Sequence, residues 1–117
     1  MGYLKNVLLV FLVFLAVSFM PYHHGWSNYD QEKVLDYKGI ILEVSFENPH
    51  ATAKLKVGDK IWLTILAPNS RMESRGVPKD KLKKGLPLRV IGYPHKEIKD
   101  EMRIERIFID EEKYELR

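Results

Sequence analysis

IILEVSFENPHATAKLKVGDKIWLTI, residues 40–65, is the stretch of sequence that decides the fold class. Apolar and polar residues alternate in three blocks of it, at 40–46, 51–57 and 61–65, which is the period of a strand with one buried face. Asn48-Pro49 separates the first two blocks, and Gly58-Asp59 forms a tight turn between the last two. These features predict three antiparallel strands, whose inward-facing side chains are expected to be Ile40, Leu42, Val44, Phe46, Leu55 and Leu63.

The period changes after residue 65. Ser70 and Glu73 have the spacing of a capping box, and Gly76 suits the position just after a helix, so a short helix is expected here. A fourth strand follows Lys84-Gly85 and ends at 92–94, with Leu88 and Val90 expected to face inward.

A fifth strand is expected from about residue 102 to residue 109. Its alternation fails around Arg106, which indicates a bulge. The acidic residues that follow, 110–112, are expected to form a solvated turn.

This order of elements predicts an all-β domain. Three meander strands, a helix and two strands match an OB-like, five-stranded, partly open barrel with one short helix between strands 3 and 4. Another small open barrel or roll is the alternative. Residues 19–36 are expected to form an N-terminal arm, either pairing back as an extra strand or staying loose, and residues 37–117 to form the barrel.

The N-terminal end has the layout of an export signal. Lys5 precedes an uncharged apolar run at 7–17, which stops at Ser18 and falls short of the roughly 20 residues that a membrane-spanning helix needs. Residues 1–18 are therefore expected to be a cleaved signal peptide, with an uncleaved anchor as the alternative. The mature chain from Phe19 is expected in the bacterial periplasm or outside the cell, without stable membrane insertion.

Composition narrows the functional classes. The 117 residues include no cysteine and carry a formal net charge of +3, so thiolate chemistry is excluded and the charge gives no indication of nucleic-acid binding. The stretch from Arg71 to Arg89 holds seven Lys or Arg against Glu73 and Asp80, which suits either an anionic surface or plain solvation.

Catalytic motifs are missing from the sequence. It has no Gly-rich phosphate loop, nucleophile elbow or His-x-x-x-His pair, so a non-enzymatic binding module is expected, with an unknown protein or glycan as its partner. The alternative from another class is a hydrolase that uses a metal-bound water, with Glu47 as the base.

Histidines are the candidate metal ligands, and they predict a copper or zinc site as the alternative function. His50 lies between strands 1 and 2, and His95 between strands 4 and 5, in loops that neighbour each other in an OB-fold. His23 and His24 lie on the arm, although adjacent residues of a strand face opposite ways. The competing interpretation is that these are surface histidines without a role.

Aromatic residues offer a second type of binding surface. Trp62, Tyr93 and Trp26 could form a stacking platform of the kind that OB-folds use for bases or sugars. The competing interpretation, which we favour, is that Trp62 plugs a barrel end or contacts the short helix.

Several short motifs resemble a family of small uncharacterised bacterial exported proteins. The motifs are His-His-Gly-Trp-Ser at 23–27 followed by Tyr-Asp, Val-x-x-x-Lys-Gly at 34–39, Glu-Asn-Pro-His at 47–50, and the strand at 84–92. The helix at 69–76 is also similar, whereas Gly25-Trp26 and Tyr29 depart from the family pattern. The resemblance implies export and an OB-like barrel, and implies no activity.

Overall fold

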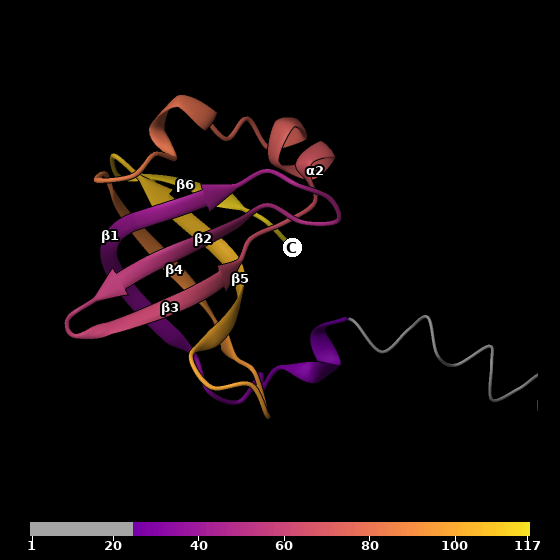
Figure 1. The fold of residues 1–117 in the computed structure, drawn as a ribbon. Helices are drawn as coiled ribbons and strands as arrows, with labels where there is room; N and C mark the ends of the chain where they lie inside the picture. The colour runs from indigo at the N-terminus through magenta and orange to yellow at the C-terminus, as the bar shows by residue number, and fades with distance from the viewer. Residues whose placement is uncertain (1–24) are drawn as a thin grey trace, which may run out of the picture.

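The computed structural model describes residues 25–117, so the expected signal peptide, His23 and His24 lie outside the described residues. The strands form one sheet in the order β3-β2-β1-β4-β5-β6. Parallel pairing of β3 with β5 closes the first five strands into a barrel (Figure 1), which confirms the predicted OB-like all-β architecture. The bounds are β1 (Leu35–Ser45), β2 (Thr52–Val57), β3 (Lys60–Ile65), β4 (Pro87–Pro94), β5 (Glu101–Ile109) and β6 (Glu112–Glu115).

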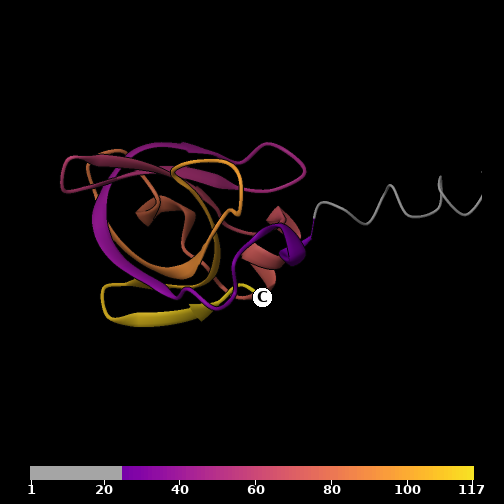
Figure 2. The ribbon, with the colours of Figure 1, turned by 90° about the horizontal axis from the view of Figure 1, so that it is seen from below.

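Short helical segments lie at the two ends of the barrel. They are η2 (Trp26–Asn28), α2 (Asn69–Ser74) and η3 (Lys79–Lys81). Figure 1 shows α2 and η3 at one end, and the arm that carries η2 at the other. Figure 2 looks along the barrel, with the strands as a ring and η3 visible through it. The predicted helix between strands 3 and 4 is thus present.

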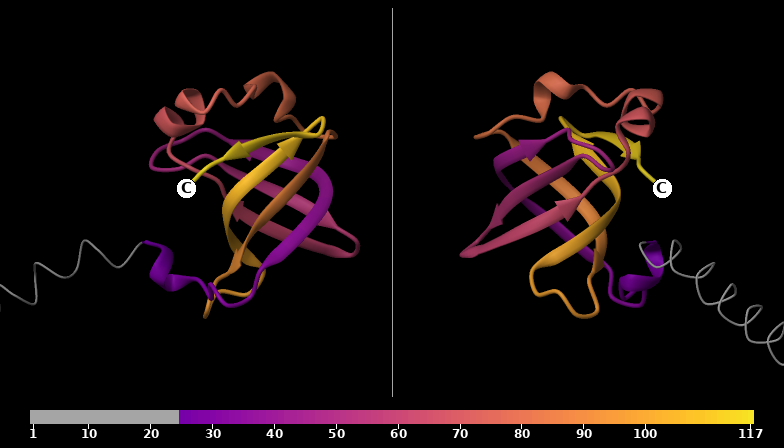
Figure 3. Two further views of the ribbon diagram at one scale, coloured as in Figure 1. Left: turned by 180° about the vertical axis from the view of Figure 1, so that it is seen from behind. Right: turned by 45° about the vertical axis from the view of Figure 1, so that its right-hand side comes forward.

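Strand β1 bends because its two halves pair with different neighbouring strands. Residues 35–40 pair with β4, and residues 40–45 pair with β2; its curve is visible in the left view of Figure 3. Gly39 lies at the bend, where an added Cβ would come 2.3 Å from the main-chain oxygen of Lys56. The missing side chain therefore lets β1 and β2 approach closely enough to close the barrel.

The prediction of which β1 side chains face the core is wrong for the first half of the strand and correct for the second half. A bulge between Ile41 and Glu43 reverses the alternation within the strand. Before the bulge Ile41 is fully buried, whereas Ile40, predicted to be inside, is 44% exposed. Beyond it Val44 and Phe46 pack against the core as predicted. One extra residue at Leu42 thus changes which face of the strand is buried.

The prediction of which β3 side chains face the core is wrong. Trp62 and Thr64 are buried, while Leu63 is only partly buried. The tight turn sets this register: it pairs Leu55 with Trp62, and directly opposite residues share a face. Thr64 is tolerated inside because its hydroxyl donates a hydrogen bond to the main-chain oxygen of Ala53 over 2.7 Å. The predictions for Leu55, Leu88 and Val90 are confirmed.

Strand β5 contains the bulge predicted around Arg106. Pairing with β4 shifts between Ile91 and Gly92, so that Glu105 is the extra residue. The predicted turn after β5 is also present, with Asp110 and Glu111 at positive φ. Strand β6, which the sequence pattern did not predict, follows this turn and pairs with the second half of β5.

The start predicted for the short helix is wrong in detail. The helix begins at Asn69 after Pro68, and no side chain caps its first turn, so Ser70 and Glu73 do not form a capping box. The Asn69 side chain instead donates to the main-chain oxygen of Phe46. This contact ties α2 to the loop between β1 and β2. Gly76, with φ +74°, ends the helix as predicted.

The described part of the N-terminal arm before β1, residues 25–34, does not pair with that strand. It forms η2 and then a single antiparallel bridge between Tyr29 and His95. The Tyr29 side chain is buried and donates to Glu101 over 2.7 Å, which fixes the arm to the start of β5. Among residues 25–117, every helix is too short or too polar to cross a membrane.

Candidate functional site

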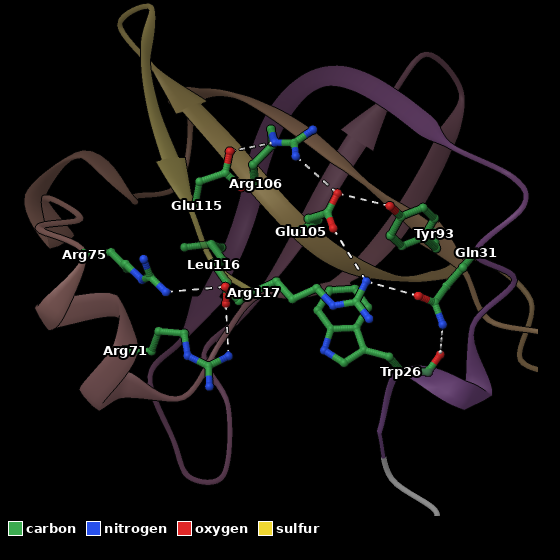
Figure 4. A network of polar contacts seen from close by, with 10 residues as sticks. All are labelled: Trp26, Gln31, Arg71, Arg75, Tyr93, Glu105, Arg106, Glu115, Leu116 and Arg117. Carbon is green, nitrogen blue, oxygen red and sulfur yellow. Dashed lines mark hydrogen bonds and ion pairs between the residues drawn. The ribbon is translucent and has the colours of Figure 1, made fainter.

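Four arginines gather on one side of the barrel, between α2 and the arm. Arg71 and Arg75 belong to α2 and its C-cap, Arg103 to β5, and Arg117 follows β6. We call these four residues the arginine cluster. Figure 4 shows Arg71 and Arg75 directed at the main-chain oxygens of residues 116 and 117, which accept from them over 3.2 and 3.4 Å. The cluster therefore brings together residues far apart in the sequence.

Trp26 of the arm contacts two of these guanidinium groups. Its ring centre lies 4.9 Å from Cζ of Arg103 and 4.2 Å from Cζ of Arg117. Cations over an aromatic face are attracted by the negative potential of the ring. The edge of Trp26 also meets Tyr93, with 6.0 Å between ring centres. These contacts hold η2 over β5 and make the arm one wall of the site.

Arg103 is the most buried member of the cluster. The residue is 7% exposed, and its Nε has no hydrogen-bond partner in the described structure. One terminal nitrogen, Nη2, lies 3.4 Å from Nε2 of His50. Burial lowers the pKa of Arg103, and so do the nearby charges of Arg71 and Arg117. A buried guanidinium usually has a carboxylate partner, so this one is under-satisfied.

The carboxylates nearest to Arg103 in sequence are occupied by other groups. Glu101 accepts the hydroxyl of Tyr29. Glu105 accepts the hydroxyl of Tyr93 over 3.0 Å and pairs with Arg106 at 3.3 Å and Arg117 at 3.5 Å, as Figure 4 shows. Within residues 25–117, no acidic side chain lies within ion-pair distance of Arg71, Arg75 or Arg103. Glu105 therefore compensates Arg117, whereas Arg71, Arg75 and Arg103 have no acidic partner among the described residues.

His50 joins this cluster to an open groove. The groove has a volume of about 320 Å³. The pKa of His50 is lowered by partial burial and by the charges of Arg103 and Arg71, so the neutral imidazole is favoured. The groove is lined by Ser45, Glu47, Asn48, Pro49, His50, Thr52 and Ile65. A ligand in the groove would meet His50, whose Nε2 lies 3.4 Å from Nη2 of Arg103.

Comparison with known protein families assigns the chain to one of them. A model described as "Family of unknown function (DUF6152)" matches residues 12–102. The chain belongs to the DUF6152 family. The match runs from within the apolar N-terminal run to the start of β5. A search of curated proteins finds no match to this DUF6152 chain.

The structure places the two described histidines of this DUF6152 barrel in different surroundings. His95 packs edge-on against Tyr29, with 5.0 Å between ring centres. Its Nδ1 accepts from the main-chain N–H groups of Glu97 and Ile98 over 3.0 and 2.9 Å, which leaves Nε2 for any ligand. Residues 25–117 contain no group of three or more His, Cys, Asp or Glu side chains able to hold a metal. The predicted partners His23 and His24 lie outside the described residues.

The predicted stacking platform divides into two parts. Trp62 is buried in the core, with 5.5 Å between its ring centre and that of Tyr37, so it does not belong to an exposed platform. Trp26 and Tyr93 meet at the arginine cluster instead.

The sequence pattern did not indicate Arg103 and Arg117 as candidate site residues. Arg103 lies between Met102 and Ile104, both fully buried, so the alternation of β5 predicts an exposed Arg. Its burial comes from the arm and the loop between β1 and β2, which contact it from distant parts of the sequence. The excess of basic residues from 71 onward was the one available signal, and it contributes two members of the cluster.

The lowered pKa of His50 makes folding stability depend on pH. Because the unfolded chain binds this proton more readily, stability is complete above the ordinary histidine pKa of about 6.5 and decreases as pH falls below it. We expect the melting temperature to fall more between pH 8 and pH 5.5 in the parent than in His50→Gln. Thermal unfolding followed by circular dichroism at both pH values measures this. An equal fall in the two proteins would contradict the assignment.

Proposed function

We propose that this DUF6152 protein is an exported, non-enzymatic binding module. Its ligand-binding face is the side of the barrel that carries the groove beside His50 and the arginine cluster. The observation that carries the proposal is Arg103, a buried guanidinium that lacks a carboxylate partner and lies next to this groove. An under-satisfied buried charge lowers stability, so its presence requires an explanation, and a bound ion is one.

The position of this face supports the proposal. In OB-like barrels ligands bind on the face of strands 2 and 3 and on the flanking loops. The groove is lined by the loop between β1 and β2, by Thr52 of β2 and by Ile65 of β3. The start of β5, next to the loop between β4 and β5, supplies Arg103.

A second candidate function is binding of copper or zinc through His50, with His23 or His24 and with His95. The observation in its favour is the lowered pKa of His50, since a metal ligand must be the neutral imidazole. The positive charges of Arg71 and Arg103 beside His50 oppose a cation. We therefore keep the metal as the alternative.

Both functions can be tested in one experiment. The chain is expressed with its own N-terminal segment and recovered from the bacterial periplasm, and its intact mass is expected to correspond to a start near Phe19. The ¹⁵N-labelled protein is then titrated separately with phosphate, succinate, maltose, copper(II) and zinc. We expect at least one of phosphate, succinate and maltose to shift the signals of His50, Arg103 Nε and the Trp26 indole together, and the organic probes to be recovered chemically unchanged.

Other outcomes would decide against the proposal. Shifts confined to the opposite surface around Arg89 and Phe108 would place binding elsewhere. Conversion of a probe that requires a metal and is lost in His50→Ala would identify an enzyme, with Glu47 as the candidate base. Saturation by copper(II) or zinc alone would establish the metal function.

A further inference from the structure

We infer that the ligand of this face is a small oxyanion, a carboxylate or phosphate group that Arg103 binds together with Arg71. The inference rests on the proposed function and specifies the chemical class of its ligand. An arginine presents five N–H donors in a planar fork that matches two oxygens of a carboxylate or phosphate. Arg103 uses this fork for one long contact, 3.4 Å to His50, and its buried Nε is unpaired in the described structure.

The surroundings of Arg103 favour an anion over a cation or a neutral ligand. Arg71 and Arg117 lie close enough for their charges to lower the pKa of Arg103. In a partly dehydrated site these charges act through a low effective dielectric, so an arriving negative charge is strongly stabilised. Glu105 compensates Arg117, with which it pairs at 3.5 Å. Arg71 and Arg103 have no acidic side chain within ion-pair distance among residues 25–117, so their charges remain available to an anion.

Arg103 borders the groove through His50 and does not itself line it. Trp26 packs on the guanidinium, with its ring centre 4.9 Å from Cζ. His50 lines the groove, which is about 320 Å³ in volume, so an anion in the groove would reach Arg103 by displacing the His50 ring. This space suits a small molecule with one or two carboxylate or phosphate groups. The ligand would replace the long Arg103–His50 contact by shorter charge-assisted hydrogen bonds.

The main variant is Arg103→Lys, which keeps the charge and removes the planar fork. The matched control is Arg89→Lys, because Arg89 makes a bidentate pair with Asp36 over 2.9 and 2.8 Å outside the arginine cluster. Phosphate, succinate and maltose are titrated at constant ionic strength while the Nε–H signal of Arg103 is observed. Comparing phosphate with succinate shows whether the site prefers a phosphate group or a carboxylate group. We expect saturable binding of at least one of them, and a loss of affinity of about tenfold or more in Arg103→Lys.

A second variant tests the inference in case Arg103→Lys does not fold. If Arg103→Lys unfolds, Arg71→Gln removes a neighbouring positive charge from the short helix, and affinity for the anion is expected to fall several-fold. Equal binding by parent, Arg103→Lys and Arg71→Gln, or a response that never saturates, would overturn the inference. Binding of maltose alone on the same face would overturn the inference that the ligand is an anion. The proposed binding function of this face would still stand.

Discussion

Gly92→Ala is expected to prevent the barrel from closing. An added Cβ at this position would lie 2.1 Å from the main-chain oxygen of Arg103 and 2.9 Å from Cα of Ile104. Both atoms belong to the backbone of the paired strand β5, so they cannot rotate away as a flexible side chain would. Strand β4 would have to separate from β5 beside the bulge at Glu105, at the cost of several hydrogen bonds.

The expected size of this effect is large for such a small domain. We expect the melting temperature to fall by at least about 15 °C, since each kcal/mol of destabilisation lowers it by about 4–8 °C in a domain of this size. Gly25→Ala is the control, because an added Cβ there meets no atom within 4 Å. Thermal unfolding measured by circular dichroism compares the two variants with the parent. If both melt like the parent, the close approach of β4 and β5 is wrong.

The second large effect is expected from a matched pair of leucines. Leu55 is fully buried in the core, while Leu63 on the neighbouring strand faces the other side of the sheet and is only partly buried. Truncating a buried leucine to alanine removes its transfer free energy and leaves a cavity, at a cost of about 2–5 kcal/mol. We therefore expect Leu55→Ala to lose that amount and Leu63→Ala to lose less than half as much.

Urea unfolding of both leucine variants measures this difference, with the free energies obtained by linear extrapolation. An equal loss would show that β3 is offset by one residue relative to β2. The more drastic change Leu63→Asp gives a further test. We expect this variant to remain folded, because its carboxylate can reach water, whereas Leu55→Asp should unfold the domain.

The register of β3 could have been derived from the sequence. A two-residue turn at Gly58-Asp59 pairs Val57 with Lys60 and therefore Leu55 with Trp62. Since paired residues share a face, Leu55 and Leu63 cannot both point inward. The alternation of β3 predicted the wrong buried face because apolar residues occupy both of its faces. The turn at Gly58-Asp59 is therefore the better indicator of which face is buried.

The bulges differ in how far the sequence reveals them. The irregular pattern at Arg106 exposed the bulge in β5, because its two halves bury Ile104 and Ile107, three residues apart. The bulge in β1 was hidden, because Ile40, Ile41 and Leu42 are all apolar and suit either phase. Only the pairing of β1 with both β4 and β2 shows where the extra residue lies.

Local pattern by itself determined the barrel class, the succession of the first five strands along the chain, the short helix and its terminal glycine. These features depend on period and on turn residues near one another in the chain. The arginine cluster depended on tertiary structure. Arg71, Arg103, Arg117 and Trp26 come from four separate segments, and each is unremarkable within its own segment. Burial and charge compensation are set by neighbours in space, so only the closed barrel and the docked arm determine that Arg103 is buried without a carboxylate.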